Sequence, residues 1–210
     1  MKRISCVIVA GVLLSLVGSA GARSYSWTPY QNDLWDLDHS KYYICRITDF
    51  SLAQNEEISL ARLTIKAINN WDNNANILYM HLMSGDDFYK LSFSHNIATR
   101  TDSQNLVDNL NYWSGIFLKS YTDLKGGDHG DKPDFEYDFT ADQRDTLESY
   151  CADSLWGLGF DPDCHFFNEG ISLQIETTTP GPPVPEPVTF LGMLGGLVGL
   201  GGYLRRRIVG

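Results

Sequence analysis

Alternation of apolar and polar residues is the clearest local pattern in this chain. From Ala61 to Ala67 every second residue is apolar, as in a strand with one buried face. Residues Ile171 to Glu176 repeat this pattern, and Ile77 to Met83 is apolar on both sides, as in a central strand. Aromatic and β-branched residues predict two further strands within Tyr42–Phe50 and Lys90–Ser94. The periodicity is therefore mainly that of β-structure.

One segment favours a helix. Thr140 and Gln143 have the spacing of a capping box, in which each residue satisfies a backbone N–H of the other. Leu147 then shares one face of the helix with Tyr150 or Cys151. The pattern predicts a short helix that starts just after Thr140.

Loops rich in Asn, Asp and Gly separate these segments at 69–74, 84–87 and 126–131. The stretch 106–121 permits either element, because its apolar residues recur at helical spacing but are also aromatic enough for a strand. Short strands joined by such loops predict an all-β fold. We expect an antiparallel two-sheet sandwich of jelly-roll type with one short helix, over residues 23–179.

The N-terminal residues 1–22 carry an export signal. Lys2 and Arg3 precede a 14-residue apolar run, and small residues follow it. This predicts a secretory signal peptide that signal peptidase cleaves after Ala22 or, alternatively, after Ala20. The run is shorter than the roughly 20 residues of a membrane-spanning helix.

The C-terminal end has three consecutive parts. Residues 180–187 form a Pro-rich linker that can continue neither a helix nor a sheet. Residues 188–204 contain no charge and, at 17 residues, reach the lower limit for a transmembrane helix. Residues 205–210 form a basic tail that begins Arg205, Arg206, Arg207. Because basic residues stay in the cytoplasm, we expect the domain on the outer side of the inner membrane.

The motif Pro185, Glu186, Pro187 stands directly before the apolar span and the terminal arginine cluster. This order resembles the PEP-CTERM sorting domain of Gram-negative bacteria. The resemblance implies that a membrane-embedded exosortase recognises the motif and releases or transfers the protein, usually in species that make extracellular polysaccharide. It implies inner-membrane anchoring with the domain in the periplasm, and a place at the cell surface or in the extracellular matrix after processing.

A second resemblance covers the domain. Asp161-Pro162-Asp163-Cys164-His165, followed by Asn168-Glu169-Gly170 and a final apolar strand, is similar to the end of modules found upstream of PEP-CTERM tails. It extends over about residues 36–178. It implies a sandwich fold and no defined activity.

The net charge of the domain bears on which class of partner it can bind. The segment from Arg23 to Pro187 contains all 26 acidic residues of the chain but only 11 Lys and Arg, so its formal charge is −15. Nucleic acid is therefore not an expected partner, because phosphate binding needs clustered positive charge. The balance suits a solvated extracellular protein or one whose carboxylates bind calcium.

Oxygen-bearing side chains gather in one short stretch, at Asp161, Asp163, Asn168 and Glu169. Calcium takes about six to eight oxygen ligands, some from backbone carbonyls, so this stretch is the first candidate for calcium, with a structural turn as the alternative. Two weaker candidate sets are Asp128, Asp131, Asp134 and Asp36, Asp38, His39.

Three cysteines remain after removal of the signal peptide, and the cell exterior permits disulfides. Cys151 and Cys164 are close in sequence, so we expect them to pair and to leave Cys45 as an apolar residue in a strand. Pairing of Cys45 with Cys164 is the alternative.

No motif predicts catalysis. The chain lacks His-Glu-x-x-His, Gly-x-Ser-x-Gly and a phosphate-binding glycine loop. Its histidines are scattered without ligand spacing: His39, His81, His95, His129 and His165. We therefore do not expect an enzyme.

Aromatic side chains can stack on sugar rings or fill the core of a sandwich. The candidates are Trp27, Tyr30, Trp35, Trp71, Trp113 and Trp156. PEP-CTERM proteins usually occur in species that make extracellular polysaccharide. Together with this resemblance, the aromatic residues favour a non-enzymatic matrix protein that binds exopolysaccharide. A structural envelope protein without glycan binding is the alternative, and a secreted hydrolase is the least favoured.

Overall fold

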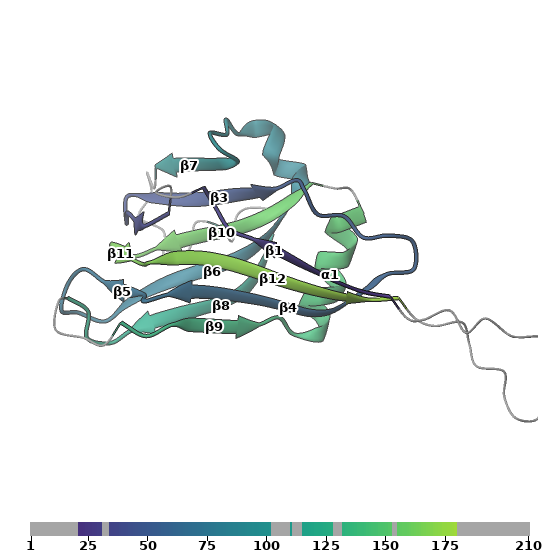
Figure 1. Ribbon diagram of the computed structural model, residues 1–210. Helices are drawn as coiled ribbons and strands as arrows, with labels where there is room; N and C mark the ends of the chain where they lie inside the picture. Colours follow the sequence, from purple (N-terminus) through teal and green to yellow (C-terminus); the bar gives the residue numbers. More distant parts are fainter. Residues whose placement is uncertain are drawn as a thin grey trace, which may run out of the picture. The chain divides into compact units, whose positions relative to one another are not determined.

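The computed structural model describes residues 21–30, 34–101, 110, 115–127, 132–152 and 155–179. They form a mostly β-structure with three antiparallel sheets and one α-helix (Figure 1). The strands are β1 (Ala22–Trp27), β2 (Asp36–Leu37), β3 (Lys41–Ile47), β4 (Glu57–Lys66), β5 (Asn69–Asn70), β6 (Asn76–Ser84), β7 (Ile97–Thr101), β8 (Ile116–Asp123), β9 (Phe135–Asp138), β10 (Trp156–Pro162), β11 (Phe166–Phe167) and β12 (Gly170–Thr178). The helices are α1 (Ala141–Ala152) and the 3₁₀-helix η1 (Gly85–Lys90).

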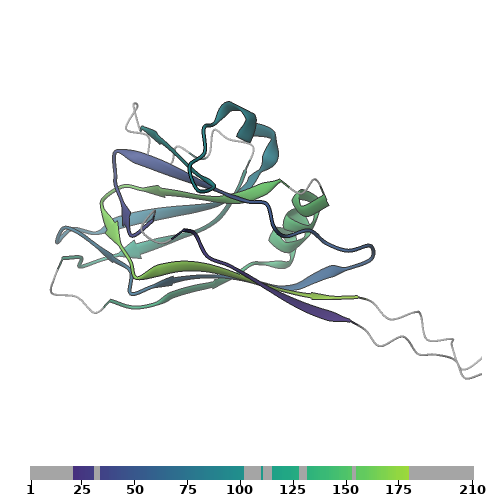
Figure 2. The same ribbon diagram turned by 45° about the horizontal axis from the view of Figure 1, so that its top comes forward.

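Two larger sheets face each other across the core. One has the strand order β1-β12-β4-β9 and the other β7-β3-β10-β6-β8, and the turned view shows them as separate layers (Figure 2). Leu63 and Leu173 of the first sheet belong to the same fully buried cluster as Leu82 and Leu158 of the second. Burial of this shared apolar surface is the main stabilising term of the fold.

The strands with clear periodicity are confirmed. β4, β12 and β6 lie where the alternating and apolar runs predicted them, and β6 is central, between β10 and β8. The predicted strand Lys90–Ser94 is wrong. Lys90 ends η1, and Ser94 opens a tight turn before β7. The stretch left open resolves into β8 from Ile116 onward.

The predicted capping box begins α1. The Thr140 N–H donates to Gln143 Oε1 at 2.9 Å, and the Gln143 N–H donates to Thr140 Oγ1 at 3.3 Å. Leu147 and Cys151 are the buried face of the helix. Reciprocal capping explains why the helix begins at this residue.

A third, small sheet has the order β2-β11-β5 and lies at the end of the domain opposite to α1 (Figure 1). Its strands have two residues each, too few for hydrophobic periodicity to reveal. The sequence therefore predicted the two larger layers but not this one.

The two ends of the described domain meet. The Thr179 N–H donates to the Gly21 carbonyl at 2.9 Å, and Ala22 pairs with Thr178 in the sheet. Apart from Gly21 and Ala22, the predicted signal peptide lies outside the described residues, as do the linker 180–187, the span 188–204 and the basic tail 205–210. In the part of the chain that the structure describes, no helix has the length and apolarity to cross a membrane.

Candidate functional site

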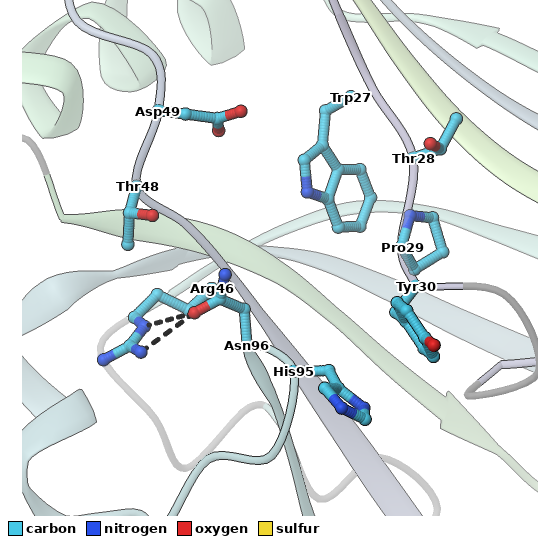
Figure 3. Close-up of a pocket in the computed structure, with 9 residues that line it drawn as sticks. All are labelled: Trp27, Thr28, Pro29, Tyr30, Arg46, Thr48, Asp49, His95 and Asn96. Atoms are coloured by element: carbon cyan, nitrogen blue, oxygen red, sulfur yellow. Dashed lines mark hydrogen bonds between the residues drawn. The ribbon is translucent and has the colours of Figure 1, made fainter.

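A pocket of about 720 Å³ lies between the end of β1, the end of β3 and the turn before β7 (Figure 3). β1 is the edge strand of the first sheet, and β3 lies next to the edge of the second. The lining residues are Trp27, Thr28, Pro29, Tyr30, Arg46, Thr48, Asp49, His95 and Asn96. Three chain segments that are distant in sequence thus contribute to one concave surface.

A strained turn supplies two of these residues. His95 and Asn96 both have positive φ angles, of 49° and 66°. Ser94 and Ile97 on either side exchange both backbone hydrogen bonds, at 2.9 and 2.8 Å. This is the geometry of a two-residue hairpin turn of type I′, where glycine is usual at the second central position. Non-glycine residues in this conformation cost energy and often mark functional sites.

Two contacts hold the Arg46 side chain in place at one side of the pocket. Asn96 Oδ1 accepts hydrogen bonds from Arg46 Nε and Nη2, at 3.3 and 2.9 Å (Figure 3). The guanidinium also lies over the Phe93 ring, 4.5 Å from its centroid. Because both contacts orient the planar group before any ligand binds, little side-chain entropy remains to be lost on binding.

Aromatic rings form the other side of the pocket. The Tyr30 ring lies 4.3 Å from the His95 ring, tilted by 30°. Tyr30 is 61% exposed, whereas Trp27 is nearly buried and forms the wall. Exposed rings beside fixed polar groups can hold a ligand that is apolar on one face and hydroxylated at its rim.

A carboxylate completes the polar rim. Asp49 accepts a hydrogen bond from the Tyr25 hydroxyl. Burial and this bond raise the pKa of Tyr25 well above its ordinary value, so the hydroxyl stays a donor and orients the carboxylate. The pocket is therefore lined by a cation, an anion, an amide and three aromatic rings.

The aromatic residues proposed from the sequence to stack on sugars lie in different places in the structure. Trp27 and Tyr30 line the pocket, Trp35 and Trp71 are exposed elsewhere, and Trp156 is fully buried in the core; Trp113 lies outside the described residues. The polar residues of the pocket, Arg46, Asp49 and Asn96, were not predicted from the sequence. Their one local signal was the polar pair at 95–96 just before a β-branched strand, which is typical of a hairpin turn.

Two of the four candidate calcium ligands, Asp163 and Asn168, bond backbone groups. Asp163 Oδ1 accepts the Ile77 N–H at 2.6 Å. Asn168 donates to the Leu34 carbonyl at 2.6 Å and accepts the Gly170 N–H at 3.0 Å. Asp161 is buried in β10, and Glu169 is exposed. The contacts of Asp163 and Asn168 are typical of a structural turn, and calcium binding by this stretch stays a prediction.

Among the described His, Cys, Asp and Glu residues, the ligand atoms of three converge at one place, formed by Asp38, His39 and His165, all within 4.8 Å of one another. Two of these belonged to a weaker candidate set, and His165 was not expected to join them. In the other weak set, Asp134 pairs with Lys66 at 2.5 Å, and Asp128 and Asp131 lie outside the described residues.

The fold does not bring Cys151 and Cys164 together. Cys151 is in α1, and Cys164 follows β10, an extended strand of seven residues that separates the two ends of the domain. Both are buried thiols. Burial and then the nearby Glu148 raise the pKa of Cys151 to about 12, so little reactive thiolate forms at neutral pH.

No family model matches this sequence, and no curated protein matches it. Among solved structures, the chain is similar to one described as Desmodium yellow mottle tymovirus, with 11% sequence identity, coverage of 89% of this chain and 97% of that chain, and a TM-score of 0.35. A likeness at this level carries no argument about function.

Proposed function

We propose that this chain is an exported, non-enzymatic protein of the cell surface or extracellular matrix, and that its domain binds extracellular polysaccharide. Signal peptidase removes residues 1–22, and an exosortase processes the tail at Pro185-Glu186-Pro187. The single observation that carries the binding role is the pocket between β1 and β3, which is lined by aromatic rings and polar groups of opposite charge.

The fold that we propose for this role is a jelly-roll sandwich. Without the extra edge strand β7, the larger sheets have the orders β1-β12-β4-β9 and β3-β10-β6-β8. The first long strand therefore lies beside the last, and the remaining strands fill the two layers as in a double Greek key. This scaffold supports the proposal because its loops and open edges are free to carry a binding surface.

Sugar rings suit the pocket. The apolar face of a pyranose can stack on Tyr30 and His95, while Arg46, Asp49 and Asn96 bond its hydroxyl groups. The charge of the domain does not oppose this, because a neutral or weakly acidic glycan meets a locally fixed guanidinium.

We expect the Tyr30→Ala protein to bind exopolysaccharide about tenfold more weakly, because loss of one stacking ring costs roughly 1–2 kcal/mol. The measurement is binding of the purified full chain to polysaccharide extracted from the producing cells, together with a glycan array. Tyr89→Ala is the matched control, since Tyr89 is 79% exposed but lies on η1, away from the pocket. Equal loss in both variants, or no saccharide binding by the wild type, would sink the glycan role in favour of a structural envelope protein.

A separate prediction concerns sorting. We expect Glu186→Ala to abolish processing of the tail, so that the protein keeps its full C-terminal mass and stays in the inner-membrane fraction. Intact-mass measurement on the membrane, surface and medium fractions shows whether the tail has been processed and where the protein is located. Glu169→Ala, an acidic residue of the domain, serves as the control that leaves processing intact. An unchanged mature mass for Glu186→Ala would leave a plain membrane anchor as the explanation.

A further inference from the structure

We infer that Asp38, His39 and His165 form a binding site for a divalent transition metal of the zinc class, with Asp36 as the residue that positions one ligand. This site is separate from the glycan pocket. Strand register, the distances between ligand atoms and a hydrogen bond from His165 to Asp36 support this site.

Strand register brings the residues together. β11 pairs with β2 so that Phe166 lies opposite Leu37 and Phe167 opposite Asp36. One step further along this antiparallel ladder, His165 comes opposite Asp38. The Asn168 N–H donates to the Trp35 carbonyl at 3.1 Å and extends this ladder, and the Trp71 N–H donates to the His165 carbonyl at 2.8 Å on the β5 side of β11. Two segments more than 120 residues apart in sequence thus meet in a defined geometry.

Two of the three distances between ligand atoms are close to those of a tetrahedral site, and the three atoms lie within 4.8 Å of one another. Asp38 Oδ1 lies 3.5 Å from His165 Nε2 and 3.6 Å from His39 Nδ1. Ligand atoms about 2.0–2.1 Å from a tetrahedral zinc ion are about 3.3 Å apart, so both distances are close to an edge of the tetrahedron. The His39 side chain is 57% exposed and can rotate by the small amount that closure needs.

The hydrogen bond behind His165 fixes its tautomer. His165 Nδ1 lies 2.8 Å from Asp36 Oδ1, and a carboxylate at that distance keeps the proton on Nδ1. The lone pair is then on Nε2, the atom that faces Asp38. An imidazole that bonds a carboxylate through one nitrogen and a metal through the other is the usual arrangement of zinc-binding histidines.

The carboxylate of Asp38 is also oriented. Its Oδ2 pairs with Lys41 Nζ at 3.1 Å, and its Oδ1, which faces both histidines, accepts the Ser40 N–H at 2.9 Å. Lys41 therefore favours metal binding through one oxygen, Oδ1. The rings of Trp71 and Phe167 lie 6.2 and 6.5 Å from the His165 ring and give the site an apolar border.

The ligand types select the metal. Two imidazoles and one carboxylate suit zinc and its neighbours, whereas calcium takes oxygen ligands. Three protein ligands leave the fourth position of a tetrahedral ion open to water or to an exogenous donor. A neighbouring chain or a ligand group can fill it.

The test is titration of the purified full chain with ZnCl₂ alone by isothermal calorimetry, and with CoCl₂ followed by absorption spectroscopy. We expect one ion per chain, and a tetrahedral cobalt spectrum without a thiolate charge-transfer band. His165→Ala and His39→Ala are expected to weaken zinc binding at least tenfold. The matched control is His95→Asn, a histidine outside the cluster where asparagine tolerates the positive φ, and it should bind as the wild type does.

Asp36 gives a graded readout. Asp36→Ala is expected to weaken zinc binding by roughly 10- to 100-fold, as is usual when a residue that hydrogen-bonds a metal ligand is removed. Asp36→Asn keeps an acceptor for Nδ1–H and is expected to restore part of that loss, with thermal unfolding of the metal-free protein unchanged in both. Absence of zinc and cobalt binding by the wild type, or wild-type affinity in both His39→Ala and His165→Ala, would overturn the proposal.

Discussion

Replacement of Glu56 by alanine is expected to lower the free energy of unfolding by about 3 kcal/mol. Glu56 is 7% exposed, and its carboxylate contacts two strands and a loop. It pairs with Arg23 of β1, accepts the hydroxyl of Thr177 in β12, and accepts the Ala53 N–H at 2.8 Å. Its removal leaves a buried hydroxyl and a backbone N–H without their acceptor.

The same carboxylate predicts a pH dependence. The hydrogen bond from Arg23 outweighs the effect of burial and, with the bonds from Thr177 and Ala53, lowers the pKa of Glu56 from 4.5 to about 2. A depressed pKa contributes stability above the unfolded value that is lost as the pH falls toward the folded value. The wild type is therefore expected to lose this stability between about pH 5 and pH 2.

Urea unfolding of the full chain from pH 7 to pH 2 measures both effects. Glu56→Gln is expected to be less stable at pH 7 and to show a flatter decline toward pH 2. The neighbouring Glu57, which is exposed, provides the control: Glu57→Gln should follow the wild-type curve. Parallel pH curves for Glu56→Gln and the wild type would contradict the role of this carboxylate.

Much of the fold follows from local patterns. The alternation at Ala61–Ala67 predicts β4 because one face of the strand is buried in the core, and the reciprocal bonds of Thr140 and Gln143 begin α1 where their spacing predicts. The strand predicted within Lys90–Ser94 was wrong because aromatic residues are frequent both in strands and in tightly packed loops. There Phe88 and Phe93 pack against each other at the end of η1, 5.5 Å apart.

The candidate sites were harder to predict, because both depend on pairing between distant segments. Nothing near His165 in sequence indicates Asp38, and only the register of two-residue strands joins them. Likewise, Arg46 and Asn96 meet because β3 pairs with β7. Oxygen-bearing side chains that are close in sequence drew attention to 161–169, where Asp163 and Asn168 bond backbone groups of distant segments.

Replacement of Gly157 by alanine is expected to destabilise the protein by more than about 3 kcal/mol. Gly157 lies in β10, between β3 and β6, and a Cβ atom there would lie 2.0 Å from the Cys45 carbonyl oxygen. The clashing atom belongs to the backbone of β3, which is paired with β10. The clash can therefore be removed only if β3 moves. Gly159 is the matched control two residues along the same strand: its Cβ would meet the ends of two flexible side chains, Leu110 at 2.7 Å and Met83 at 3.0 Å. Gly159→Ala should cost about 1 kcal/mol, and similar unfolding midpoints for the two variants would show that β3 yields more easily than its hydrogen bonds imply.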